Sequence, residues 1–348
     1  MPTVDRGWRH AYTRQRFVIM ERIHQADTQF GEGTRMAILV LGGTGFIGPR
    51  AIRRLVARGE QVVCMDINPG AVSFAEFGKN VKVVRGDVTQ FEDVMRITVE
   101  TQPSRILNLA YLLGSGEDQP HFAMKLNILG MDNCFEAARL CGVKRVVYAS
   151  SIAVSGLQKH FGDQPINEDA PTYGTSQYAM HKIFNEFQAA QYNKHHGMLI
   201  TGIRPANVTG PDKIRGSVDH VQLITEPARG KPVHFPWKAM MRLPIHVEDM
   251  AEVFVRVLLA DAPRYQVYNS GGTPISLGAL ADIVRTFLPD AQITFANEGG
   301  VEESGNYLAD NSRLCQEFEV EYPPFRSRVL EIINAIRQEE GLPLVQGH

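Results

Sequence analysis

Tyr178 and Lys182 are the side chains in this sequence best suited by type and spacing to acid/base chemistry. Residues at i and i+4 share one face of a helix, so the phenol and the ammonium would lie close together. A free tyrosine has a pKa of about 10, and a neighbouring cation favours the phenolate and lowers that value. The pair therefore predicts a group that exchanges a proton with a substrate hydroxyl or carbonyl.

Ser151 is the third candidate for this chemistry. It follows the apolar run 145–149, so it would lie at the end of a buried strand. A serine hydroxyl there can hold the substrate oxygen while charge develops on it. A Tyr-x-x-x-Lys match is common by chance, but here a serine-bearing strand precedes it in the order that the chemistry needs. We therefore predict Ser151, Tyr178 and Lys182 as the catalytic residues.

A glycine-rich turn follows the first apolar run of the chain. It contains Gly42, Gly45 and Gly48, with Phe46 and Ile47 between the last two, and a helical stretch follows it. The first glycine permits a tight turn, the second lets backbone N–H groups approach a pyrophosphate, and the third allows close packing of helix on strand. An anion would sit at the helix N-terminus, where unpaired N–H groups favour negative charge. The turn predicts a dinucleotide site.

Acidic residues at the ends of the next two strands indicate which dinucleotide is bound. Asp66 ends the second apolar run, eighteen residues after Gly48. A carboxylate there accepts both adenosine ribose hydroxyls and repels a 2′-phosphate, which favours NAD over NADP. Asp87 follows the third run and is placed to hold the adenine amine, with Val88 beside the ring. We therefore expect NAD as the cofactor.

Short apolar runs alternate with amphipathic stretches from residue 36 onward, which predicts a doubly wound parallel sheet, an α/β fold of the Rossmann type. Glycines and prolines after residue 205 indicate a smaller, interleaved C-terminal lobe that binds substrate. We predict an N-terminal extension over 1–35, an NAD-binding domain over 36–205 and 243–270, and the lobe over 206–242 and 271–348. The strands are expected at 37–41, 61–66, 81–85, 105–109, 145–149, 199–203 and 266–268, and the helices near 50–58, 90–100, 120–141, 175–195 and 247–259.

Composition narrows the classes of partner. The formal net charge of −2 argues against nucleic-acid binding through phosphate contacts. No apolar run is long enough to span a membrane, and no cysteine or histidine cluster has metal-ligand spacing. The four cysteines form no CxxC pair, which indicates a reducing, cytoplasmic setting. We expect a small-molecule substrate and no metal.

From Met36 to about residue 310, the chain resembles the extended short-chain dehydrogenases/reductases of the NAD-dependent epimerase/dehydratase type. The matching segments are GGTGFIG (42–48), Asp66, GDV (86–88), NLA (108–110), YASSIAVSG (148–156), YAMHK (178–182), RPANVTGP (204–211) and HVEDMA (246–251).

The resemblance implies a role for several further residues. It places Ser151 and Tyr178 at the reacting C–O group and Lys182 on the nicotinamide ribose. It also implies that helices 120–141 and 175–195 form the interface of a homodimer. The other implied positions are Ala110 and Tyr111 along the cofactor, Asn127 in a supporting role, and Asn207 and Arg242 on the substrate side.

Two reactions of this family, epimerisation of a nucleotide sugar and oxidation of a small alcohol, compete for the assignment. A third, dehydration, is disfavoured because Ile152 and Ala153 are apolar where dehydratases carry an acid. A nucleotide-sugar epimerase with tightly bound NAD is favoured by Arg242, which aligns with an arginine that grips a diphosphate. The acidic stretch 298–303 would repel a diphosphate, and Ser155 and Thr209 replace tyrosines of the epimerase pattern.

The other reaction is oxidation of a secondary alcohol on a small polar substrate. Residues 108–117 and 151–156 are similar to the L-threonine dehydrogenase branch. We favour this NAD-dependent oxidoreductase and keep the epimerase as the alternative. A non-catalytic NAD sensor is a third reading, and the intact Ser/Tyr/Lys set argues against it.

Overall fold

A seven-stranded parallel sheet forms the centre of the protein, in the order β11-β6-β5-β4-β1-β2-β3. The computed structural model describes residues 37–113, 118–300 and 305–347, so the expected extension over 1–35 lies outside the described residues. The strands are β1 (Ile38–Leu41), β2 (Val62–Asp66), β3 (Val81–Arg85), β4 (Arg105–Asn108), β5 (Arg145–Ala149), β6 (Leu199–Arg204) and β11 (Val267–Asn269).

The apolar runs form this sheet because both of its faces are covered. In β1, Ile38 and Val40 belong to one apolar core, while Leu39 and Leu41 belong to the core on the opposite face. The predicted doubly wound α/β fold is confirmed. Strand order reverses between β1 and β4, which opens a crevice at the carboxyl ends of the strands, where ligands of such sheets bind.

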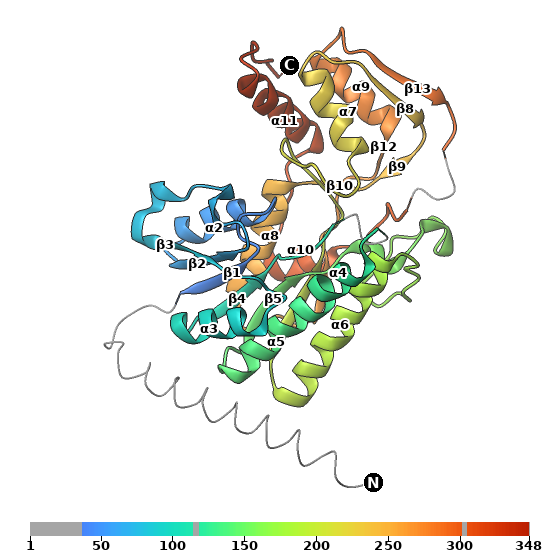
Figure 1. Cartoon of the computed structure of the whole chain (residues 1–348). Coiled ribbons are helices and arrows are strands. Elements are labelled where there is room, and N and C mark those ends of the chain that lie inside the picture. Colours follow the sequence, from blue (N-terminus) through green and yellow to red (C-terminus); the bar gives the residue numbers. More distant parts are fainter. Residues whose placement is uncertain (1–36, 114–117, 301–304, 348) are drawn as a thin grey trace.

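Helices on the two faces position the segments that follow the strands (Figure 1). The helices α2 (Gly48–Ala57) and α8 (Val247–Leu259) cover one face and pack on each other. The other face carries α3 (Phe91–Thr101), α5 (Gly130–Leu140) and α6 (Gln177–His196). The helix expected over 120–141 is divided into α4 (Pro120–Met124), a π-helical turn η3 (Lys125–Leu129) and α5. The short 3₁₀ turns are η1 (Pro69–Ala71), η2 (Ala75–Asn80), η4 (Ile152–Ser155) and η5 (Gln158–His160).

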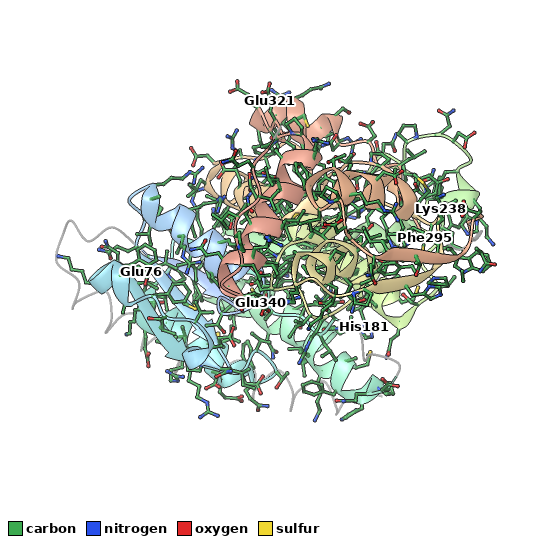
Figure 2. The ribbon with its side chains drawn as sticks, turned by 90° about the horizontal axis from the view of Figure 1, so that it is seen from above. Glu76, His181, Lys238, Phe295, Glu321 and Glu340 are labelled. Carbon is green, nitrogen blue, oxygen red and sulfur yellow. The ribbon has the colours of Figure 1, made fainter. Side chains whose placement is uncertain are left out.

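A smaller lobe with its own apolar core stands beside the carboxyl edge of the sheet. In the view from above, Lys238 and Phe295 of this lobe lie on the side away from Glu76 of η2 (Figure 2). Its helices are α7 (Asp219–Ala228), α9 (Leu277–Phe287) and α11 (Phe325–Glu339). Its strands form the parallel pair β8 (Val233–Trp237) with β13 (Ile293–Asn297) and the antiparallel pair β9 (Met241–Arg242) with β12 (Ile275–Ser276), and β7 (Asn207–Thr209) joins β10 (Pro244–His246) at its base.

The chain passes between the sheet and the lobe more often than the sequence indicated. The helix α10 (Ser312–Phe318) lies against β11, and Leu314 and Val320 belong to the core shared by α2 and α8. These residues fall within 271–348, the second segment predicted for the lobe. The domain boundaries stay a prediction, and this stretch packs with the sheet.

The described residues contain neither a membrane-spanning helix nor a cluster of metal-binding side chains. No helix among them combines the length and the apolar character needed to cross a bilayer. They also contain no group of three or more His, Cys, Asp or Glu side chains that could hold a metal ion.

The four cysteines are free thiols, and burial raises the pKa of Cys64, Cys134 and Cys141 to about 12.

Candidate active site

The glycine-rich turn passes so close to neighbouring backbone that two of its positions admit no side chain. Gly42 has φ +74°, and a Cβ there would lie 2.6 Å from the backbone N of Ala110. At Gly48 a Cβ would lie 2.5 Å from the carbonyl oxygen of Gly43. The turn is therefore pressed against the segment that follows β4 at Gly42 and closes tightly on itself at Gly48. This is a cradle that fits a pyrophosphate.

The N-terminus of α2 has the electrostatics of an anion site. Its N-cap is Ile47, which offers no side-chain acceptor, and its first turn carries no acid. Helix N-termini leave backbone donors unpaired, and the helix dipole favours negative charge there. Phe46 precedes the cap, and Arg50 stacks on its ring with the guanidinium 5.3 Å from the centroid. The residues present thus fit the phosphates of a dinucleotide.

Asp66, at the end of β2, is held beside this turn by two backbone donors. Thr44 N–H donates to its Oδ2 over 3.1 Å, and Asn68 N–H donates to its Oδ1 over 3.0 Å. A carboxylate oxygen accepts more than one hydrogen bond, so both oxygens keep capacity for ribose hydroxyls. The fixed negative charge would repel a phosphate at the same place.

Asp87, Val88 and Ala110 lie along the same edge of the sheet. Asp87 Oδ1 accepts a hydrogen bond from Thr89 N at 2.9 Å, which orients the carboxylate. Val88 is buried, and its carbonyl accepts from Asn133 Nδ2 at 2.8 Å. Ala110 N donates to Asn108 Oδ1 at 3.1 Å just after β4. The predicted cofactor residues therefore line one continuous rim.

Tyr178 and Lys182 lie in the first turns of α6, where the helix meets the end of β5. The helix begins at Gln177 because Ser176 caps it, accepting from Ala179 N at 3.1 Å. Lys182 is buried and its Nζ donates to Ala149 O at 2.5 Å, with the centroid of the Tyr178 ring 5.7 Å away. The i, i+4 spacing does place phenol and ammonium on one face.

Ser151 lies buried at the end of β5 and is oriented by its own backbone. Its Oγ accepts from Ala153 N at 3.1 Å and caps η4. Burial raises the pKa of the half-buried Tyr178, and a hydrogen bond with the Ser151 side chain works in the opposite direction. The structure thus brings together the three side chains predicted as catalytic. They can pass a proton to or from an oxygen held by the serine.

An ion network beneath Lys182 went unnoticed in the sequence. Glu186, one further turn along α6, accepts two hydrogen bonds from Arg204 at 2.8 and 2.7 Å and one from Ser150 at 2.5 Å. Burial lowers the pKa of Lys182 well below its usual value, and Glu186 opposes that shift. The i, i+4 spacing of Lys182 and Glu186 was the signal that could have found it.

Asn127 has a structural role within η3. Its amide oxygen accepts from Leu112 N at 2.8 Å, and its Nδ2 donates to Leu112 O at 3.3 Å. Its own carbonyl accepts from Asn185 Nδ2 at 3.1 Å. The residue therefore ties the loop after β4 to α6, next to the Tyr178 and Lys182 pair.

The two residues expected on the substrate side already have protein partners. Asn207 Oδ1 accepts from Leu243 N at 2.8 Å, which joins β7 to the segment before β10. Arg242 donates from Nε and Nη2 to the two carboxylate oxygens of Asp219, at 3.0 and 2.5 Å. These contacts place both residues at the base of the lobe, and their binding roles stay predictions.

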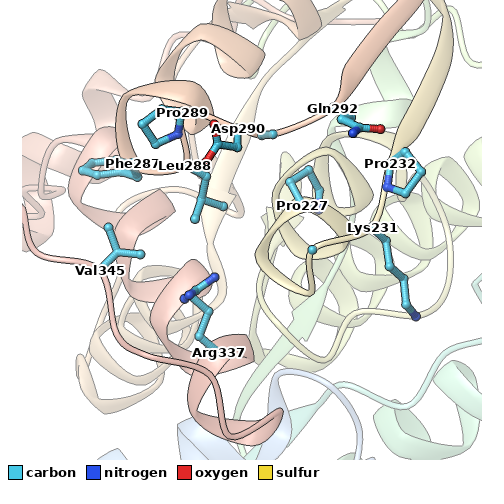
Figure 3. A pocket seen from close by; sticks show the side chains of 12 residues that line it. Pro227, Lys231, Pro232, Phe287, Leu288, Pro289, Asp290, Gln292, Arg337 and Val345 are labelled. Carbon is cyan, nitrogen blue, oxygen red and sulfur yellow. The ribbon is translucent and has the colours of Figure 1, made fainter.

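Two hollows stand out in the described part of the molecule. One, of about 480 Å³, lies between the loop after β4 and the loop after β7 and is lined by Leu112, Leu113, Gln119, Phe122, Ile214, Arg215 and Gly216. The other, of about 390 Å³, lies within the lobe between Pro227, Phe287 and Arg337 (Figure 3). The lining of the first hollow begins at Leu112, the residue after Tyr111 in the chain.

The fold and these side chains define a class, the dinucleotide-dependent α/β enzymes that act on a C–O group. The chain belongs to the NAD dependent epimerase/dehydratase family, whose sequence profile matches residues 38–271. The family resemblance and the NAD cofactor expected from the sequence are thereby confirmed.

Individual relatives are nucleotide-sugar and amino-acid enzymes. The UDP-glucose 4-epimerase of Mycolicibacterium smegmatis is 33% identical over 183 residues, which cover 51% of this chain and 57% of that protein. The UDP-glucose 4-epimerase of Thermus thermophilus, solved in complex with NAD, has a TM-score of 0.75 at 23% identity, covering 87% and 99% of the two chains. A GalE-like L-threonine dehydrogenase from Cupriavidus necator has a TM-score of 0.75 at 20% identity, covering 86% and 99%. The two solved structures share the fold.

The assignment of Asp66 predicts a change of cofactor preference. In the double variant Asp66→Ala/Ile67→Arg, the repelling carboxylate is lost and the exposed position after it gains a cation that can pair with a 2′-phosphate. We expect the ratio of dissociation constants for NADP⁺ and NAD⁺, measured by calorimetry, to fall by roughly 10- to 100-fold. Asp66→Asn, which keeps an acceptor for the turn, serves as control. An unchanged ratio in the double variant would contradict the role of Asp66.

Proposed function

We propose that this protein is an NAD-dependent dehydrogenase that oxidises a secondary alcohol on a small polar substrate to the ketone. NAD⁺, when bound, supplies the two-electron acceptor for the hydride that leaves the carbinol carbon. Gly42, Gly45 and the start of α2 would hold its pyrophosphate, and Asp66 and Asp87 its adenosine. Lys182 would contact the nicotinamide ribose.

The protein's own side chains handle the proton and the oxygen. Ser151 donates a hydrogen bond to the substrate oxygen and fixes its position. Tyr178, as the phenolate, removes the hydroxyl proton. The ammonium of Lys182 favours that phenolate, which otherwise would form only at high pH because burial raises the pKa of Tyr178. In the reverse direction Tyr178 returns the proton to the alkoxide.

The ion pair between Arg242 and Asp219 is the observation that favours a small substrate over a nucleotide sugar. Burial works against the charge on Asp219, but hydrogen bonds from His220 and Arg242 lower its pKa overall, so it stays ionised. A diphosphate brought to Arg242 would meet this carboxylate, and the two anions would repel each other. The acidic stretch 298–303 of the sequence would also repel a diphosphate. Glu298 pairs with Lys238 at 2.8 Å, and residues 301–304 lie outside the described residues.

The second candidate function is a nucleotide-sugar epimerase with tightly bound NAD. The identity to the UDP-glucose 4-epimerase of Mycolicibacterium smegmatis over half of this chain favours it, together with the position of Arg242 in the base of the lobe. An epimerase returns the hydride to the same substrate, so it forms no net NADH. This difference separates the two functions in one assay.

The dehydrogenase predicts net NADH formation that depends on Tyr178. A panel of hydroxy acids, amino alcohols and hydroxy amino acids is incubated with NAD⁺, and absorbance at the NADH maximum is followed. We expect one member to give NADH and Tyr178→Phe to lower its kcat/KM by about 10²- to 10⁴-fold, because the general base is lost. Tyr173→Phe, at an exposed tyrosine, is the control. Isomerised UDP-sugar without NADH would replace the dehydrogenase by the epimerase.

We also propose that the protein is a cytoplasmic homodimer that binds neither nucleic acid nor a membrane. The face of α6 away from the sheet exposes Met180, Phe184 and Phe187, which recur at intervals of four and three residues. Leu129 of η3 is exposed as well. An apolar stripe of this kind on a helix surface is typical of a contact with a second copy.

A charge in this stripe is expected to separate the subunits. In Phe187→Glu, a carboxylate would be buried without a partner at the interface, so the dimer dissociation constant should rise by roughly 100-fold. Sedimentation velocity over a range of concentrations measures it. Leu344→Glu places the same charge at an exposed leucine far along the chain and should leave the association unchanged. A dimer that persists in Phe187→Glu would show that the subunits meet elsewhere.

A further inference from the structure

Tyr111, in the loop after β4, touches both residues of the predicted proton-transfer pair. The Nζ of Lys182 lies 3.1 Å from the centroid of the Tyr111 ring, compared with 5.7 Å for the Tyr178 ring. The rings of Tyr111 and Tyr178 meet edge to face, with centroids 5.6 Å apart and planes at 87°. The ammonium thus rests on the face of Tyr111, and Tyr178 is held against the same ring.

The other partners of the ammonium leave its charge only partly compensated. Lys182 donates to the carbonyl of Ala149, which is a neutral acceptor. The carboxylate that opposes the loss of its charge, Glu186, is shared with Arg204, which binds both of its oxygens. A cation over an aromatic face is stabilised more strongly when it is removed from water, as Lys182 is. The Tyr111 ring is therefore a principal support of the charge.

We propose that Tyr111 is a positioning residue whose ring face keeps the buried Lys182 ammonium charged and in place beside Tyr178. The inference rests on the proposed function, because it takes Tyr178 and Lys182 as the acid/base pair. Tyr111 itself exchanges no proton in the reaction. Its ring fixes the geometry of the pair and maintains the positive charge that makes the Tyr178 phenolate accessible.

The surroundings of Lys182 determine whether its pKa rises or falls when the Tyr111 ring is removed. Burial raises the pKa of the Tyr111 hydroxyl, so this residue is neutral and contributes its ring rather than a charge. Without the ring, the desolvated ammonium loses its proton at lower pH, and Tyr178 then keeps its proton to higher pH. The titratable and charged groups that face Lys182 are Tyr178, His181 and Glu186 on α6, Tyr111 from the loop after β4, and, through Glu186, Tyr148 of β5 and Arg204 of β6.

The first test measures the pKa of Lys182 without any turnover. The full-length protein is labelled with ¹³C-lysine, the Lys182 methylene signal is assigned with Lys182→Met, and its shift is followed against pH. In Tyr111→Leu the pKa of Lys182 should fall by about one pH unit, which is the size of a desolvated cation–π contact. Tyr111→Phe keeps the ring and should keep the value. A value in Tyr111→Leu equal to that of the wild type overturns the inference.

The second test is the pH profile of NADH formation. In a plot of log kcat/KM against pH, the ascending limb should shift to higher pH by about one unit in Tyr111→Leu. In Tyr111→Phe it should stay in place. Thermal unfolding checks that each variant folds, and Tyr111→Met replaces the leucine variant if that one is unstable. A pKa change of Lys182 in an enzyme that forms no NADH would overturn the proposed dehydrogenase alone. NADH formation with an unmoved limb in the leucine variant would overturn the role of Tyr111.

Discussion

A lysine ammonium withdrawn from water is the constraint around which this molecule is arranged. Removing such a group from solvent is costly unless its protons and its charge find partners. Lys182 finds a carbonyl at the end of β5, an aromatic face from the loop after β4, and a shared carboxylate one turn along its own helix. Each partner comes from a different element, so the site forms only when sheet, loop and helix are in register. The contacts that place the candidate catalytic lysine are therefore the same contacts that join sheet, loop and helix.

The sequence was informative wherever function depends on local spacing. The buried strands are continuous apolar runs, and the candidate residues follow them directly or repeat at the helical interval, as Tyr178 and Lys182 do. What escaped prediction depends on partners distant in the chain. The pairs of short strands in the lobe have too few residues to show a period, and the contact of Arg242 with Asp219 spans 23 positions. The π-helical turn η3 contains Asn127, whose side chain bonds the backbone of Leu112 fifteen residues earlier, a tertiary contact that local spacing does not reveal.

The parts of the fold that serve the cofactor and the parts that are particular to this chain lie in different regions of the molecule. The sheet, the glycine turn and the strand-end acids form a surface suited to one cofactor, whatever the substrate. The lobe is the part proposed to face the substrate, and at its base side chains are paired with one another, as Arg242 is with Asp219. A fold of this kind supports many reactions because the part that faces the substrate varies while the cofactor surface is kept. On the proposed function, selectivity in this chain is expected to depend on the segments around β7 and β9.

The repeated crossing of the chain between sheet and lobe has a consequence for how the polypeptide becomes native. The strand β8 has its only described partner in β13, and α7 packs against α9 and α11, all of which come later in the chain. A nascent chain that has emerged as far as β11 therefore holds an unpaired strand edge and an uncovered apolar helix face. Such edges invite association with other chains. The lobe core can therefore close only after α9, β13 and α11 have been synthesised, so the last fifth of the chain is needed to cover these surfaces.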